Sequence, residues 1–316
     1  MTKKIALVFP GQGSQKVGMG KNFYDNFLEA KEVFQEVDEV LKQNLAQLIF
    51  SGEQAELTKT ENAQPALMAV SLAMVKVLNK LSGKNIVDYT AYVAGHSLGE
   101  YSALAAADAL TIKDCAALLQ VRGTAMRDAG NKTSGAMAAV IGVDTVTAQK
   151  ITEQAAQGDI CQIANDNSIG QIVISGHKSA IHRAVTIGKE LGAKKVIPLP
   201  VSGAFHSELV AEAAAKVEAK LAEIELTSPT VPVISNVTAA AVSETSEIKN
   251  LLVKQVTSAV RFRESVENLK KLGVTDIIEI GAGNVLTGLV KRIDPEITLA
   301  NIREPEELET FIKDYL

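Results

Sequence analysis

Short apolar runs and longer amphipathic stretches alternate along the first part of the chain. The run from Ile5 to Phe9 ends at a Pro-Gly pair, and a second run covers Tyr92 to Ala94; both are typical of buried strands. Apolar residues at helical spacing, with start signals such as a first-turn proline at Pro65, predict four helices: residues 27–41, 65–81, 98–110 and 111–129. Thr111 and Asp114 are expected to form a capping box for the last of these. Alternating strands and helices predict an α/β fold.

The pattern changes in the middle of the chain. The expected order there is strand, helix, strand, strand, helix and strand, over residues 136–141, 144–157, 160–164, 171–175, 179–191 and 195–199. This is the ferredoxin-like order, so we expect a small inserted α+β domain over residues 131–199. Afterwards we expect a helix over 208–224, a strand over 232–235, two helices, a strand over 276–280 and a charged last helix. Residues 1–130 and 200–316 are therefore expected to form one larger domain.

Composition narrows the class of protein. The 316 residues are 47% hydrophobic and 22% charged, as in a globular chain with a sizeable core, and the net charge of −5 gives no general attraction for nucleic acid or anionic lipid. The two cysteines, Cys115 and Cys161, lack neighbours at metal-finger spacing. The first apolar run is too short for a secretory signal, and no run approaches the roughly 18 residues of a membrane span. We expect a cytoplasmic protein with no metal and no nucleic-acid or membrane partner.

The segment AGHSLGEYSAL places Ser97 between Gly95 and Gly99, after an expected strand and before an expected helix. This is the context of a nucleophile elbow, in which a strained turn exposes the serine hydroxyl above a sheet. The N–H of Leu98 at the helix start then points toward a developing oxyanion. The alternative is a tight turn without chemistry; the context favours a nucleophile. For the larger domain we expect an α/β-hydrolase-like fold with a parallel sheet.

A serine hydroxyl is a weak nucleophile without an adjacent base, and the chain has four histidines. His177 and His182 flank the second helix of the inserted region and are expected to be exposed. His96 is next to the serine, where neighbours in a tight turn point in different directions, so it is expected to support the site from behind. His206 follows the inserted region, in a loop at the end of a strand, where sites gather in open α/β sheets. It is the best candidate base by elimination.

Two further segments are candidates for the site. The loop FPGQGSQ lacks the patterns of phosphate-binding loops, so no nucleotide site is expected. Beside an elbow, such a loop supplies a second oxyanion donor, here the N–H of Gln12. Arg122 interrupts an otherwise apolar helix. Its planar guanidinium suits a substrate carboxylate, and a structural salt bridge is an equally good explanation from the local sequence.

Together these segments resemble one family. FPGQGSQ, GHSLGEYSAL, the VRG that contains Arg122, GAFHS and QVTSAVRF occur in the same order as in the malonyl-CoA:acyl carrier protein transacylases, and EIGAGNVLTGLVKR is also similar. The resemblance covers nearly the whole chain. It implies that Ser97, with His206 as base, takes the malonyl group from malonyl-CoA and passes it to the phosphopantetheine thiol of acyl carrier protein. Nothing calls for a metal or a bound organic cofactor, because coenzyme A enters as part of the substrate.

The resemblance also implies roles that spacing alone does not mark. Arg122 would hold the malonate carboxylate, and a main-chain carbonyl near Gln255 would orient His206. On that basis Gln255 is carried over as a substrate-binding residue. Phe205 matches the malonyl-type choice, and its bulk would disfavour a 2-methyl branch. Asn167 is expected to contact substrate in the cleft between the domains.

Two residues depart from the family pattern. Many relatives have proline in place of Ala259 and tryptophan in place of Phe262. These changes put the local shape behind the histidine in question, and they remove no proposed chemical group.

Two other classes of protein remain as alternatives. A serine thioesterase or esterase of the α/β-hydrolase type places an acid and then a late histidine after its serine, whereas here 110 residues follow the candidate base. A catalytically silent module that docks acyl carrier protein would be expected to lose its nucleophile or its base. The sequence favours the acyltransferase, and a monomer is expected.

Overall fold

Two sheets organise the protein, of which the computed structural model describes residues 3–201 and 203–316. Within these residues the larger sheet has the strand order β10-β9-β1-β2-β7-β8, and all neighbours are parallel except β7 and β8. Its strands are β1 (Ile5–Phe9), β2 (Thr90–Gly95), β7 (Val233–Ile234), β8 (Ala241–Val242), β9 (Asp276–Ile280) and β10 (Thr298–Ile302). The smaller sheet is antiparallel, in the order β4-β5-β3-β6: β3 (Gly135–Ile141), β4 (Cys161–Ser168), β5 (Gln171–His177) and β6 (Lys195–Pro198). The expected mixed α/β class is confirmed.

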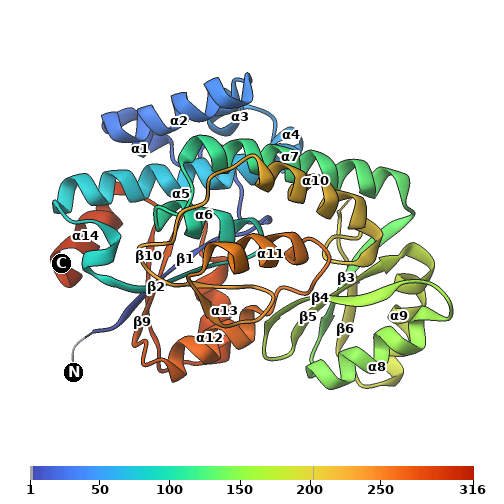
Figure 1. The fold of residues 1–316 in the computed structure, drawn as a ribbon. Helices are drawn as coiled ribbons and strands as arrows, with labels where there is room; N and C mark the ends of the chain where they lie inside the picture. Colours follow the sequence, from blue (N-terminus) through green and yellow to red (C-terminus); the bar gives the residue numbers. More distant parts are fainter. Residues whose placement is uncertain (1–2, 202) are drawn as a thin grey trace.

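Helices cover both faces of the larger sheet (Figure 1). On one side lie α1 (Lys21–Asn26), α2 (Leu28–Leu41), α3 (Leu45–Ser51), α4 (Gln54–Thr58), α5 (Thr60–Ser82), α6 (Leu98–Ala106), α7 (Ile112–Lys132), α10 (Ala211–Ala222), α11 (Thr245–Gln255) and α14 (Pro305–Tyr315). On the other lie α12 (Phe262–Lys271) and α13 (Val285–Ile293). Leu7 and Phe9 of β1 belong to the first core, and Ala6 and Val8 to the second. The strand is apolar throughout because both of its faces are buried.

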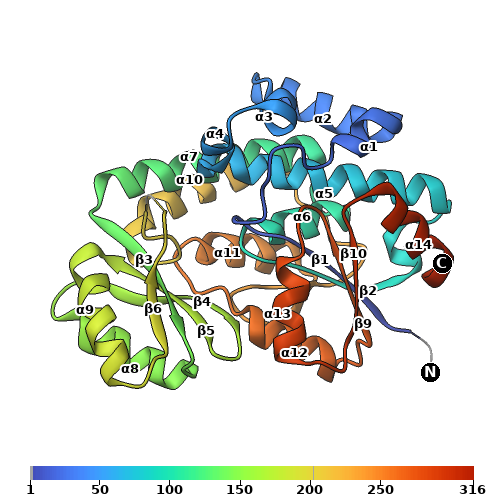
Figure 2. The same cartoon turned by 180° about the vertical axis from the view of Figure 1, so that it is seen from behind.

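The smaller sheet lies at the end of the molecule away from the two termini, as Figure 2 shows. One of its faces is covered by α8 (Thr145–Ala156) and α9 (Lys178–Glu190). Met137 and Val173 on the other face join the main core, so the sheet closes one side of the larger layer. The elements from β3 to β6 fall inside the expected insertion, 131–199, and the division of the chain into domains stays a prediction.

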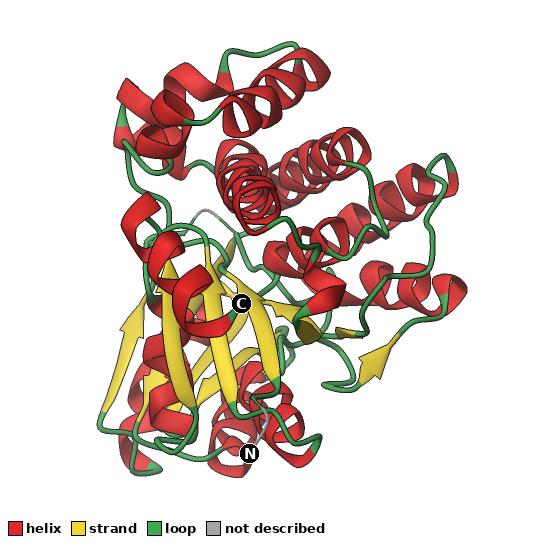
Figure 3. Ribbon diagram, turned by 90° about the vertical axis from the view of Figure 1, so that its left-hand side faces the viewer, coloured by secondary structure: helices red, strands yellow, loops and turns green. Residues whose placement is uncertain are grey.

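Parallel pairing of β1 with β2 brings two of the predicted motifs together. Phe9 at the end of β1 pairs with Gly95 at the end of β2. The loop FPGQG and the turn GHSLG therefore leave the sheet side by side at one edge. Helices stand above that edge of the strands (Figure 3). In open α/β sheets, sites form at the carboxyl ends of the strands.

Two predicted helix boundaries were wrong. Helix α5 begins at Thr60, so Pro65 lies inside it rather than at its first turn. The turn before Pro65 contains the buried polar residues Thr60 and Gln64, whose side chains are hydrogen-bonded to each other at 2.9 Å. Helix α6 ends at Ala106 instead of Leu110, because Asp108 takes a left-handed φ of 58° and reverses the chain.

Other differences concern short segments. The stretch NDNSIG, residues 165–170, is the expected turn-rich connection between two strands, and most of it is strand: β4 continues to Ser168 through two register shifts. It is held by a second partner, because Asp166 N–H donates to the Val260 carbonyl and Val260 N–H donates to the Ala164 carbonyl. Strands β8 and β10 were not predicted, and the helix expected over 208–224 is divided into a 3₁₀ turn, Glu208–Val210, and α10. A further 3₁₀ turn covers Ile86–Asp88.

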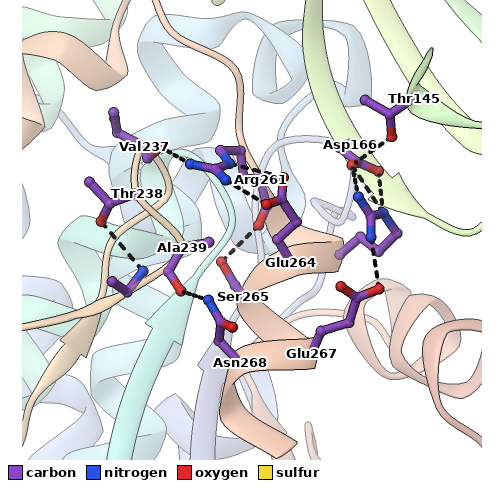
Figure 4. A network of polar contacts seen from close by, with 12 residues as sticks. Thr145, Asp166, Val237, Thr238, Ala239, Arg261, Glu264, Ser265, Glu267 and Asn268 are labelled. Carbon is purple, nitrogen blue, oxygen red and sulfur yellow. Dashed lines mark hydrogen bonds and ion pairs between the residues drawn. The ribbon is translucent and has the colours of Figure 1, made fainter. Parts of the chain in front are cut away.

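An ion pair joins the smaller sheet to α12 (Figure 4). The Asp166 carboxylate accepts from Arg263 Nε at 3.0 Å and from one terminal nitrogen at 2.8 Å, and Thr145 Oγ1 donates to it at 3.1 Å. Arg263 also contacts Glu267 at 2.7 Å. With the pairing of β4 to Val260, these contacts fix the smaller sheet against the larger layer.

Helix α5 is the longest apolar helix of the core, although polar residues such as Ser71 and Lys76 interrupt its apolar runs. Within the described residues, this helix is long and apolar enough to cross a membrane by length and composition, and 72% of its most apolar window is buried inside the protein. Core helices pass the same test.

Replacing Asp166 with asparagine should lower the free energy of unfolding by about 2 kcal/mol, because it leaves the largely buried Arg263 without its main counter-charge. The side chains of this pair are 4% and 22% exposed. Urea unfolding measures the change. Asp25→Asn is the control, since it breaks the Lys21–Asp25 pair, whose side chains are 49% and 46% exposed. Equal urea midpoints for Asp166→Asn and wild type would show that the Asp166–Arg263 ion pair contributes nothing to the stability of the fold.

Candidate active site

Ser97 occupies the turn between β2 and α6 in a strained conformation, with φ 54° and ψ −110°. The turn is tight because α6 packs directly on β1. A Cβ at Gly99 would lie 2.2 Å from the Phe9 carbonyl oxygen, and one at Gly95 would lie 2.0 Å from the Gly99 carbonyl. Only glycine fits at either position, and the turn has the geometry that a nucleophile elbow requires.

His206 is hydrogen-bonded to the serine hydroxyl. Its Nε2 lies 2.8 Å from Ser97 Oγ, and its Nδ1 lies 2.9 Å from the Gln255 carbonyl oxygen and 3.2 Å from that of Ser258. Carbonyl oxygens only accept, so Nδ1 carries the hydrogen and Nε2 is left to accept from the serine. The pair needs no carboxylate, since two main-chain carbonyls orient the ring.

The environment keeps His206 neutral. Burial, and then the positive charge of Arg122, lower its pKa to about 3, against a smaller opposing effect of the two carbonyls. A neutral imidazole is the form that accepts a proton, so the ring is ready to act as a base at neutral pH.

Arg122 projects from α7 toward the Ser97 hydroxyl. It is 1% exposed, and one terminal nitrogen donates to Ser97 Oγ at 3.0 Å and to Gln255 Oε1 at 2.9 Å. The other donates to Gln64 Oε1 at 2.7 Å. Its carbon Cζ lies 5.3 Å from the centre of the Tyr101 ring, within reach of a cation–π contact.

The partners of Arg122 are neutral. Its hydrogen bonds within the described residues all go to hydroxyl or amide oxygens, and its Nε has no partner there. A buried charge without a counter-ion is unfavourable, and burial lowers the pKa of Arg122. The guanidinium is therefore suited to an anion that arrives beside the serine, and the salt-bridge explanation of Arg122 was wrong.

A cavity of about 610 Å³ opens onto Ser97 and His206. Gln12, Leu98 and Phe205 line it, as their expected roles require. Further apolar lining comes from α7, from β3 and from the segment after β6: Met126, Met137, Leu199 and Val201. The cavity therefore has a polar end, where Ser97 lies, and an apolar wall.

Two expected substrate contacts are not on the cavity wall. Gln255 is fully buried behind Ser97 and Arg122. Asn167 directs its Oδ1 to His96 Nε2 at 2.8 Å, and Asn165 is the asparagine of β4 that lines the cavity. His96 is only partly buried and itself lines the cavity, so the expectation that it lies behind the site was wrong; its contact with Asn167 fixes the ring beside the turn.

The two positions that depart from the family pattern remove no group from the site. Phe262 packs beside His96, with ring centres 5.8 Å apart.

Four buried polar residues at the site were not predicted from the sequence: Gln64, Glu100, Tyr101 and Asn236. Gln64 and Thr60 connect the Gln12 side chain to Arg122, through bonds of 2.9, 2.9 and 2.7 Å. One signal was available for Glu100, because a charged residue in the apolar helix LGEYSALAA is the same anomaly that marked Arg122. Within the described residues there is no cluster of metal-ligating side chains.

A serine in an elbow, a neutral histidine on its hydroxyl and an unpaired arginine beside both define a serine enzyme of acyl transfer that accepts an anionic acyl group. Comparison with known proteins agrees, since residues 6–301 match the family model described as an acyl transferase domain. The malonyl CoA-acyl carrier protein transacylase of Bacillus subtilis (strain 168) is 46% identical over 312 residues, which cover 98% of this chain and 96% of that protein. That of Escherichia coli (strain K12) is 41% identical over 305 residues, which cover 96% and 97%.

Solved structures lead to the same family. An acyl-carrier-protein-S-malonyltransferase from Bartonella henselae superposes with a TM-score of 0.95 at 46% identity and 98% coverage of both chains. A malonyl-transacylase in complex with a type II PKS acyl-carrier protein gives a TM-score of 0.94 at 38% identity, with 99% of this chain and 100% of that chain covered. The chain belongs to the acyl transferase family and, within it, to the malonyl CoA-acyl carrier protein transacylases.

Replacing Gly99 with alanine should lower the free energy of unfolding by about 3 kcal/mol, because its Cβ would force α6 away from β1. Thermal unfolding tests this. The matched control is Gly288→Ala, also in a helix, where an added Cβ meets nothing within 4 Å and alanine should hold or raise the midpoint. Equal midpoints for the two variants would contradict the close approach.

Proposed function

We propose that this protein transfers a malonyl group from malonyl-CoA to the phosphopantetheine thiol of acyl carrier protein, through a malonyl ester of Ser97. The observation that carries the proposal is the position of Arg122. It is a buried cation with neutral partners, 3.0 Å from the serine oxygen, in a chain whose relatives are named malonyl CoA-acyl carrier protein transacylases. Its two terminal nitrogens suit a bidentate contact with the malonyl carboxylate.

Acylation begins when Ser97 Oγ bonds to the thioester carbonyl carbon and gives its proton to His206 Nε2. The N–H groups of Gln12 and Leu98 hold the resulting oxyanion. The carbon–sulfur bond then breaks, and the coenzyme A sulfur takes the proton from His206. The products are free coenzyme A and malonyl-Ser97.

The second half reverses these steps with a new thiol. The phosphopantetheine thiol gives its proton to His206 and attacks the ester carbonyl. The bond to Ser97 Oγ breaks, and the serine recovers the proton. Arg122 holds the carboxylate throughout. This contact orients the acyl group for the incoming thiol, so that transfer to the thiol is faster than attack of water on the ester.

Phe205 is proposed to set the preference for an unbranched malonyl group, because its ring lines the cavity beside the base. One methyl group is worth about 1–3 kcal/mol, so this is a preference and not an absolute exclusion.

The order of the elements supports an α/β-hydrolase-like larger domain and a ferredoxin-like insertion. We propose a cytoplasmic monomer without a bound metal or organic cofactor and without nucleic-acid or membrane partners, on the basis of the net charge of −5 and the composition.

Mixing the protein with malonyl-CoA should give a covalent malonyl adduct in intact-protein mass spectrometry, which disappears when holo acyl carrier protein is added. Ser97→Ala should give no adduct, because it removes the nucleophile. Free malonate without loaded carrier would instead make the protein a thioesterase, and no adduct with no turnover would favour a silent binding module.

Replacing Arg122 with alanine should lower kcat/KM for malonyl-CoA on the order of 10²-fold, through loss of a buried charge-assisted contact. The rate with acetyl-CoA, which has no carboxylate, should fall much less, so the preference for malonyl should shrink. Parallel assays with both thioesters measure this. An unchanged preference for malonyl over acetyl would refute the assignment of Arg122 to the carboxylate.

A further inference from the structure

Side chains hold both main-chain polar groups of the strained Ser97. The Ser97 N–H donates to Asn236 Oδ1 at 2.7 Å, and the Ser97 carbonyl accepts from Gln255 Nε2 at 2.9 Å. Asn236 Nδ2 also donates to the Gly95 carbonyl at 2.6 Å, on the other side of the turn. A strained conformation persists only where its surroundings determine it, and these two amides are such surroundings.

One carboxylate lies behind both amides. Glu100 is in the first turn of α6 and is 2% exposed. Its Oε2 accepts from Gln255 Nε2 at 2.7 Å and from the Asn236 main-chain N–H at 3.1 Å. The Ser97 backbone is therefore held by Asn236 and Gln255, and both of these residues donate to the same oxygen atom, Glu100 Oε2.

Glu100 also fixes which way the Gln255 amide points. A carboxylate only accepts, so it draws the NH₂ end of the amide toward itself. The amide oxygen is left facing Arg122, whose terminal nitrogen donates to it at 2.9 Å. The main-chain carbonyl of Gln255 accepts from His206 Nδ1. One residue thus contacts the serine backbone, the arginine and the base, and Glu100 sets its orientation.

We propose that Glu100 is a positioning residue of this site: its buried carboxylate fixes Gln255 and Asn236, which in turn hold Ser97 and Arg122 in their reactive arrangement. The inference rests on the proposed function of Ser97 and Arg122, and it assigns to the glutamate of GHSLGE a role in the rate of acylation. Without the carboxylate the Gln255 amide is free to rotate. Its NH₂ group then faces the Arg122 guanidinium, which needs an acceptor.

Because Glu100 can gain or lose a proton, its positioning role should be visible in the pH dependence of the acylation rate. Burial raises its pKa to about 7, against the opposing effects of Gln255, the Asn236 N–H and the charge of Arg122. The other titratable groups that face this cluster are His206, His96 and Tyr101. Burial lowers the pKa of His96, lowers that of His206 to about 3 and raises that of Tyr101 to about 12, so neither His206 nor Tyr101 changes charge near neutrality.

Protonation of Glu100 should slow acylation, since hydrogen bonds to an ionised carboxylate are about twice as strong as neutral ones. The rate should therefore rise with pH between about 6 and about 8, as the carboxyl group loses its proton. This rise belongs to Glu100 and not to His206, which stays neutral over the same range.

The test is the single-turnover rate of malonyl-Ser97 formation, measured by rapid quench and intact-protein mass spectrometry across this pH range. Glu100→Gln keeps an acceptor oxygen and removes the charge. It should hold the rate near the low-pH level of the wild type, about 10-fold below the high-pH level, without the rise. Glu100→Ala removes the acceptor as well and should lose on the order of 10²-fold at every pH.

The matched control is Glu279→Gln. Glu279 is another fully buried carboxylate, which accepts from the Leu286 and Thr287 N–H groups at the start of α13. Its hydrogen bonds go to α13 and β10 and to none of the site residues. It should lower the thermal midpoint and leave the acylation rate of the folded enzyme, with its pH profile, unchanged.

Three results would overturn the proposal: a rise with pH that persists in Glu100→Gln, a folded Glu100→Ala enzyme within about threefold of the wild-type rate, or an equal rate loss in Glu279→Gln. Should Glu100→Ala fail to fold, the profile of Glu100→Gln decides alone. A wild-type protein that forms no adduct refutes the proposed function instead, so the two failures are distinct.

Discussion

The close packing of α6 on the carboxyl end of β1 is the contact on which the site depends. Gly99 lies against the Phe9 carbonyl, too near for any side chain. This approach brings the N-terminus of the helix over the edge of the sheet and leaves Ser97 in a left-handed conformation. The strain is balanced by polar side chains buried behind the turn, so the fold sets the nucleophile before a substrate arrives. Such preorganisation is the main source of electrostatic catalysis.

The charges of the site are kept apart by neutral groups. Gln255 lies between the Arg122 guanidinium and the Glu100 carboxylate and bonds to both. Because the two ions do not contact each other, the guanidinium keeps its donors for an external anion. Its charge also lowers the pKa of His206 and so keeps the base unprotonated.

Through β4, the antiparallel sheet pairs with the segment that contains Ser258, whose carbonyl orients His206. Predictions from the sequence were least accurate in this sheet. Alternation and turn signals predicted its order of elements, because each element has its own period. They did not predict that NDNSIG is strand. That stretch is ordered by Val260, which comes much later in the chain and pairs with β4 just after Ser258, whose carbonyl accepts from His206. Local composition indicates a turn, and a distant partner makes it a strand.

The sequence by itself determined the strands that carry the site, the elbow around Ser97, and His206 as the proposed base, because these depend on apolar runs, glycine positions and a short list of histidines. It singled out Arg122 as a misplaced charge and could not say what the charge meets. Only the tertiary structure decided that, because its partners Gln64 and Gln255 lie 58 and 133 residues away. Glu100 is the same case, since it meets Gln255 across 155 residues. Periodicity records whether a side chain is buried. Whether a buried charge faces an acid, an amide or an open cavity depends on how distant segments pack.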